Sequence, residues 1–130
     1  MPALSSYLRK ALLTDAVISG LASAGMIAGA GLTAGPFGLP AELLTWAGIA
    51  CIPFVALIVF ALRTRAVPAG LIVAIIAINF AWVAGSLYVA FGPSFAPTLL
   101  GRIFVLGQGA MVFVFAELQV IGLRRGGAAA

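Results

Sequence analysis

Two apolar stretches in the first half of this chain have the length that a helix needs to cross a membrane. Residues 16–34 and 43–62 contain no charged side chain and are 19 and 20 residues long. A helix rises 1.5 Å per residue, so about 20 apolar residues cover the roughly 30 Å hydrocarbon core of a bilayer. Each stretch therefore predicts a transmembrane helix.

The second half of the chain supplies two more segments of this kind. No charged residue occurs between Arg65 and Arg102, and Gly92, Pro93 and Pro97 interrupt the interval. Glycine and proline at this density mark a loop between two helices. The sequence thus predicts an all-α membrane protein, a four-transmembrane-helix bundle in one membrane domain, with helices at about 11–34, 42–62, 67–91 and 99–123.

The composition supports lipid as the main solvent and excludes several classes of function. The 130 residues are 64% hydrophobic and only 8% charged, whereas soluble domains are about half apolar and a quarter charged. Seven basic residues are too few for a nucleic-acid-binding surface. With no histidine and with Cys51 as the single cysteine, thiol-redox and histidine-ligated haem chemistry are excluded. We expect no enzyme activity, no cofactor and no metal site.

The basic residues predict how the chain is oriented. Six of the seven fall on one side of a chain with four crossings, leaving Arg102 as the exception: Arg9, Lys10, Arg63, Arg65, Arg124 and Arg125. Cytoplasmic loops of membrane proteins carry an excess of lysine and arginine. The pattern predicts that both termini lie on the cytoplasmic side.

A secretory signal peptide is the alternative interpretation of the N-terminal segment. Basic residues, an apolar run and the small residues 28–30 occur there in the order that a signal peptide uses. Asp15 interrupts the apolar run, and cleavage would leave an odd number of crossings and lose the charge asymmetry. We therefore interpret the segment as the first span. A mature protein beginning near residue 31 would contradict this interpretation.

Two features predict how the helices pack. Pro53 lies in the middle of the second span, where proline removes a backbone hydrogen bond and is expected to kink the helix. Small residues recur at four-residue spacing in the first and third spans, which favours close approach of helices in lipid. These residues are Gly20, Ala24, Ala28, Ala77, Ala81 and Gly85, together with the pairs Gly25/Gly29 and Gly31/Gly35.

Polar residues inside the spans are the candidate functional site, because charge in hydrocarbon is costly and usually faces protein or water. Asp15 and Glu117 are expected at similar depth near the cytoplasmic end. Ser19 lies one helical turn beyond Asp15, and Asn79 lies in the middle of the third span. We expect Asn79 to form a hydrogen bond between helices.

Two interpretations of the carboxylates remain open. In the first, Asp15 and Glu117 pair with nearby cations and close the inner end of the bundle; the candidate cations are Arg63, Arg65, Arg124 and Lys10. In the second, the two carboxylates bind a proton or a cation in a water-accessible vestibule. Loss of folding in Asn and Gln variants would support the first, and loss of transport in a folded protein would support the second.

The fourth span carries a second polar edge. Gln108 and Gln119 are eleven residues apart and share one face, which is opposite Glu117. A helix with polar groups on two sides is difficult to bury in one core. We expect Gln108 and Gln119 to face a partner, either a second copy or another membrane protein.

Two motifs support a resemblance. The segment 79–86, with sequence NFAWVAGS, and the ending 119–125, with sequence QVIGLRR, resemble a group of small bacterial four-helix membrane proteins of uncharacterised function. The resemblance implies a four-helix fold in the bacterial cytoplasmic membrane. It implies no activity.

Two functions fit these features. The first is a structural or accessory subunit of a membrane complex or homo-oligomer, favoured by the short loops and the two polar edges of the fourth span. The alternative is a small oligomeric transporter or channel for a proton-coupled or apolar solute, with Asp15 and Glu117 as the binding groups. Small multidrug-resistance transporters resemble this plan, but the one-sided basic residues argue against the antiparallel dimers that they form.

Overall fold

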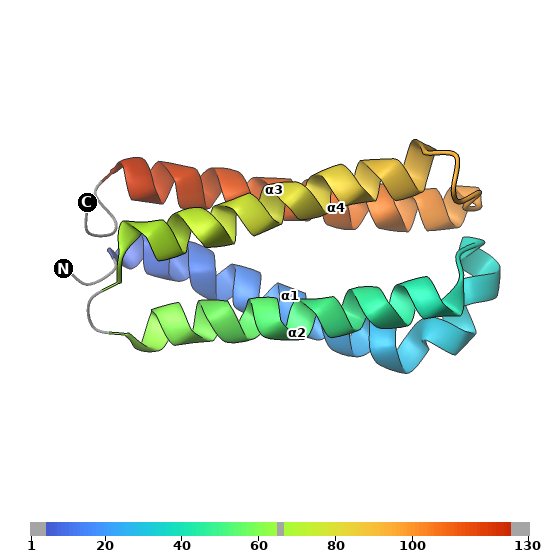
Figure 1. The fold of residues 1–130 in the computed structure, drawn as a ribbon, viewed down its shortest axis with the longest axis horizontal. Coiled ribbons are helices and arrows are strands. Elements are labelled where there is room, and N and C mark those ends of the chain that lie inside the picture. The colour runs from blue at the N-terminus through green and yellow to red at the C-terminus, as the bar shows by residue number, and fades with distance from the viewer. Residues whose placement is uncertain (1–4, 65–66, 126–130) are drawn as a thin grey trace.

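The protein is an all-α bundle, seen in a computed structural model that describes residues 5–64 and 67–125. This described part forms four helices: α1 (Ser6–Phe37), α2 (Ala41–Arg63), α3 (Ala69–Phe91) and α4 (Leu99–Arg124). All four are long and apolar enough to cross a membrane, so the predicted four-helix membrane bundle is confirmed. Figure 1 shows the helices running side by side along the long axis.

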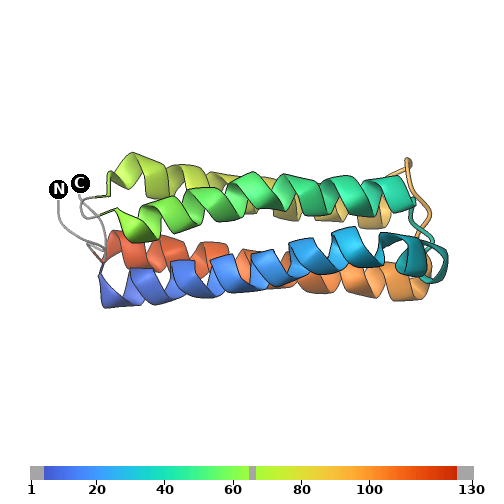
Figure 2. The same cartoon turned by 90° about the horizontal axis from the view of Figure 1, so that it is seen from below.

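The four helices do not pack equally against one another. α1 packs against both α2 and α4, and α3 packs mainly against α4, whereas α2 and α3 touch only sparsely. α1 begins, and α4 ends, at the same end of the bundle (Figures 1 and 2). We call this the terminal end, and the opposite end, which carries the connections α1–α2 and α3–α4, the loop end.

α1 begins earlier than the sequence predicts. The Ser5 hydroxyl accepts a hydrogen bond from the backbone amide of Leu8 at 3.1 Å and caps the helix. A serine cap satisfies an amide that would otherwise lack a partner. Leu8 and Leu12 are then fully buried, so packing stabilises the first turns even though Arg9 and Lys10 interrupt the apolar pattern. The expected start near residue 11 is therefore wrong by about five residues.

The sequence analysis predicts packing surfaces at the small residues spaced four apart in the first and third spans, which we call the predicted stripes. The close contacts between helices occur at other glycines. A Cβ at Gly48 would lie 2.9 Å from the backbone oxygen of Ser23, and one at Gly101 would lie 2.0 Å from the backbone oxygen of Phe37. Around the glycines of the predicted stripes a Cβ would meet nothing within 4 Å: Gly20, Gly25, Gly29, Gly31, Gly35 and Gly85. The predicted stripes are thus not the packing surfaces within the bundle.

Pro53 lies within α2, which the structure assigns as one helix from Ala41 to Arg63. A proline inside a helix removes one intrahelical hydrogen bond and crowds the carbonyl four residues earlier. Membrane helices tolerate this where neighbouring groups satisfy the freed carbonyl, and the Pro53 ring is exposed on the outer surface. The kink that the sequence predicts at this position stays a prediction.

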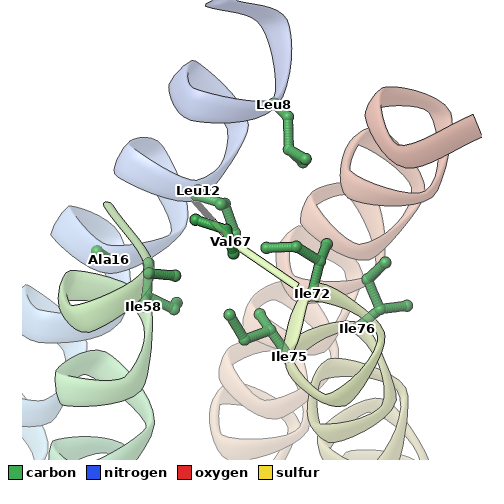
Figure 3. Packing of buried hydrophobic residues seen from close by; sticks show 9 residues of the cluster. Leu8, Leu12, Ala16, Ile58, Val67, Ile72, Ile75 and Ile76 are labelled. Carbon is green, nitrogen blue, oxygen red and sulfur yellow. The ribbon is translucent and has the colours of Figure 1, made fainter. Parts of the chain in front are cut away.

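Buried apolar residues form two clusters, one at each end of the bundle. The terminal-end cluster joins α1, α2 and α3 and contains Leu8, Leu12, Ala16, Ile58, Ala61, Val67, Ile72, Ile75 and Ile76. Figure 3 shows these side chains converging between the helices. The loop-end cluster is smaller and contains Ala30, Leu39, Leu44, Ala90 and Val105. Among the polar candidates, Ser19, Asn79 and Gln108 lie along their helices between residues of the two clusters.

Candidate functional site

A network of hydrogen bonds centred on Asp15 lies inside the bundle. The Asp15 carboxylate accepts a bond from the Ser19 hydroxyl at 2.9 Å, from the Asn79 amide at 2.9 Å and from the Gln119 amide at 2.7 Å. Asn79 also donates to the Gln119 side-chain oxygen at 2.9 Å. Asp15 and Gln119 are 0% exposed and Asn79 is 2% exposed. We call these four residues the Asp15 network.

Three helices meet in this network. Asp15 and Ser19 are four residues apart on α1 and therefore share a face, while Asn79 comes from α3 and Gln119 from α4. All three neighbours donate to the Asp15 side-chain oxygens, so this side chain is the common acceptor of the network. The buried polar groups are thus satisfied by neutral side chains, and the network fixes α1, α3 and α4 at one level.

A second polar cluster lies nearer the loop end. The Trp82 indole donates to the Gln108 side-chain oxygen at 2.6 Å. The Gln108 amide donates to the Ser86 hydroxyl and to the Val105 carbonyl, both at 2.8 Å. The bonds of Gln108 with Trp82 and Ser86 join α3 to α4, and the bond to Val105 lies within α4. Ser86 also lies close to Gly109, where an added Cβ would be 3.1 Å from the serine.

Two adjoining cavities lie beside these polar groups. The central cavity, of about 180 Å³, has walls from all four helices and reaches Ser19, Asn79 and Gln108. The lateral cavity, of about 380 Å³, lies between α2 and α3 where those helices touch sparsely, and extends toward the loop end. Four residues line both cavities: Met26, Ile78, Trp82 and Gln108. Both cavities are lined mainly by apolar side chains.

The structure separates the two carboxylates that the sequence places together. Glu117 is exposed on the outer side of α4, while Asp15 is fully buried. Glu117 lies two residues before Gln119, which corresponds to about 200° around the helix, so burial of Gln119 turns Glu117 outward. The prediction that Asp15 and Glu117 form one site at the inner end is wrong.

The proposed ion pairs of Asp15 are also absent from the described part of the chain. Its hydrogen-bond partners there are Ser19, Asn79 and Gln119, and none of them is cationic. Arg63 and Arg124 are exposed at the terminal end. Arg65, another candidate partner, lies outside the described residues. Neutral donors can satisfy a buried carboxylate without a cation, which periodicity alone does not reveal.

Gln108 and Gln119 point inward rather than toward a partner. Gln119 is 0% exposed and belongs to the Asp15 network, and Gln108 is half-buried beside the two cavities. The prediction that the two glutamines share a face is correct, but the prediction that this face points toward a partner is wrong. The glutamine face points into the core, and the opposite face with Glu117 points outward. Asn79 does bond between helices as expected.

Trp82 is the site residue that the sequence analysis did not select. It lines both cavities and binds Gln108. A signal existed, because Trp82 lies three residues after Asn79 on the same face of α3 and sits in mid-span, where an indole N–H needs a partner.

Within residues 5–64 and 67–125, no group of three or more acidic, cysteine or histidine side chains is placed to hold a metal ion. Comparison of the chain with protein families, with curated proteins and with solved structures finds no match. The resemblance to small bacterial membrane proteins therefore stays a prediction.

Proposed function

We propose that this multi-pass membrane protein is a structural or accessory subunit, which assembles with itself or with another membrane protein. The observation that carries the proposal is the outward position of Glu117. Glu117 lies seven residues before Arg124, about 10 Å along the axis at 1.5 Å per residue. A carboxylate at this depth on a lipid-facing surface is costly, and contact with a partner relieves the cost.

The small residues of α1 support the same proposal. A Cβ at Gly20 or Gly25 would meet nothing within 4 Å, and Ala24 and Gly25 are exposed on the outer surface. Surfaces of this kind allow a second helix to approach closely in lipid. The setting that we propose is the bacterial cytoplasmic membrane, with both termini in the cytoplasm, because five of the described basic residues lie toward the terminal end: Arg9, Lys10, Arg63, Arg124 and Arg125.

Gentle extraction from the native membrane tests the proposal. We expect the chain to migrate in a native gel as an assembly larger than its 13.2 kDa mass, with its partners identified by mass spectrometry. Glu117→Ala should shift this assembly toward the single chain. Val114→Ala, one turn away on the same outer surface, is the matched control. A single chain in native lipid, unaffected by either variant, would contradict the proposal.

A second candidate is a small transporter or channel in which Asp15 is the proton- or cation-binding group, while Glu117 lies on the outer surface and is not part of the same site. The central cavity favours it, since that cavity reaches Asn79 and Ser19, which both bind Asp15 directly. The outward position of Glu117 favours the first candidate instead. Uptake of a proton-coupled solute into vesicles, lost in Asp15→Asn while the fold remains intact, would support the second candidate.

A further inference from the structure

The space between α2 and α3 is a pocket of defined shape. Its walls are lined by small residues where larger ones would fill it: Ala47 on α2 and Ala81 and Gly85 on α3. Ala81 and Gly85 are exposed, and a Cβ at Gly85 would meet nothing within 4 Å. Since these residues belong to the apolar spans, the pocket opens sideways toward lipid.

The combined size suits a small molecule. The lateral cavity of about 380 Å³ adjoins the central cavity of about 180 Å³, and ligand pockets have volumes of roughly 300–1,000 Å³. The described residues that line the two cavities include no charged side chain. An uncharged occupant that dissolves in the bilayer fits this lining.

The polar side chains deep in the two cavities offer free hydrogen-bond acceptors and few free donors. Asn79 uses both amide hydrogens on Asp15 and Gln119, which leaves its side-chain oxygen for another partner. Gln108 likewise uses both amide hydrogens on Ser86 and Val105. Its oxygen accepts one bond, from Trp82, and has a second lone pair.

Ser19 follows the same rule. Its hydroxyl hydrogen is given to Asp15, so its oxygen can only accept from a ligand in the central cavity. A molecule that forms a hydrogen bond with Asn79, Gln108 or Ser19 must therefore be the donor of that bond. A ketone, an ester or an ether would find the amide, hydroxyl and indole donors of the cavity already occupied, and the Cys51 thiol is only a weak donor.

We propose that these adjoining cavities bind an uncharged, lipid-soluble molecule whose polar end is a hydroxyl group. The hydroxyl donates to the acceptors beside Asn79 and Gln108, and the apolar body lies between α2 and α3. The site is independent of the proposed assembly through α1 and α4, because the opening lies on the other side of the bundle. Either proposal can fail without the other.

Tryptophan fluorescence gives a direct test, because the chain has two tryptophans in different places. Trp82 lines both cavities, whereas Trp46 is 67% exposed on the outside of α2. In the Trp46→Phe variant only Trp82 emits, so the fluorescence reports on the cavities. In the Trp82→Phe variant only Trp46 emits, so the fluorescence reports on the surrounding lipid. The probes are a brominated long-chain alcohol and its methyl ether, added to the full chain in phosphatidylcholine nanodiscs that hold one copy.

We expect the alcohol to quench Trp82 saturably and the ether to bind roughly three- to tenfold more weakly, the value of one hydrogen bond. Quenching of Trp46 should rise without saturation, equally for both probes. Gly85→Leu should remove the saturable component. Gly107→Leu is the matched control, since Gly107 also has open space around it but lies exposed on α4.

Two results would overturn the proposal. Equal quenching of Trp82 by the alcohol and the ether would show that the cavities do not recognise the hydroxyl hydrogen. Saturable quenching that persists in Gly85→Leu and in Ala47→Leu, which fills the opposite wall, would place the binding elsewhere. Circular dichroism of each variant checks that the helices form.

Discussion

The terminal half and the loop half of the bundle differ in how their interiors are filled. In the terminal half, branched apolar side chains from three helices pack closely around fully buried residues such as Ile72 and Ile75. In the loop half, the larger cavity separates α2 from α3, and a half-buried polar cluster lines it. The Asp15 network lies at the border between the two halves.

This contrast shows which part of the molecule holds the fold and which part is available for binding. Helices in lipid associate through van der Waals contact and hydrogen bonds, so the half whose interior is filled by apolar side chains supplies most of the packing energy. The loop half has fewer contacts between helices where the lateral cavity lies, and this space can hold a ligand. The expected effects below are ordered from the largest to the smallest.

Removing Asp15 should cause the largest loss. In Asp15→Ala the Asn79 and Gln119 amides lose a shared acceptor in a fully buried position. Each of these two unsatisfied donors costs about 1–3 kcal/mol, so we expect a loss of roughly 2–6 kcal/mol in the free energy of unfolding in mixed micelles. Glu117→Ala, which changes an exposed acid on the same bundle, should change stability by less than about 0.5 kcal/mol. Equal losses would mean that the buried network does not hold the helices.

Truncation of the terminal-end cluster should come next. Ile75 is 0% exposed, and Ile75→Ala should cost about 2–3 kcal/mol, since the surrounding side chains cannot close the void. Leu43 lines the lateral cavity and is only half-buried, so Leu43→Ala should cost less than about 1 kcal/mol. Denaturant titration of both variants in the same micelles measures the difference. A larger loss for Leu43→Ala than for Ile75→Ala would mean that the loop half, and not the terminal half, supplies most of the packing energy.

Glycine substitutions test where the helices touch. A methyl group at Gly101 would meet the Phe37 backbone, so Gly101→Ala should cost about 1–3 kcal/mol. Gly25 has open space, and Gly25→Ala should instead stabilise the monomer by about 0.5–1 kcal/mol through helix propensity. Thermal unfolding of a monomeric preparation measures both. Destabilisation by Gly25→Ala would show that Gly25 is packed inside the bundle, as the sequence predicts.

The polar cluster of the loop half should contribute least. Ser86→Ala removes the acceptor of one Gln108 hydrogen bond, but Gln108 keeps its bond to the Val105 carbonyl. Hydrogen bonds between membrane helices contribute about 0.6 kcal/mol on average, and we expect a loss of this size. The unfolding free energy measures it, and the emission wavelength of Trp82 checks the local geometry. A loss as large as that of Asp15→Ala would place a second structural centre in the loop half.

The sequence alone determined the spans of this protein. Their length, apolarity and interruption at Gly92 and Pro93 are local properties, so the helices could be predicted before any contact was known. The start of α1 was missed because burial of Leu8 outweighs the charges beside it. Helical periodicity also showed that Gln108 and Gln119 share a face opposite Glu117.

Only the tertiary structure decided which face of each helix points inward. Periodicity fixes angles around one helix axis, but the rotation of that helix toward its neighbours depends on all of them at once. Packing of α1 against α4 buries Gln119 beside Asp15 and turns Glu117 out. The sparse contact between α2 and α3 creates the lateral cavity, and no single segment encodes it. The site depends on side chains from different helices meeting at one depth, which is a property of the assembled bundle.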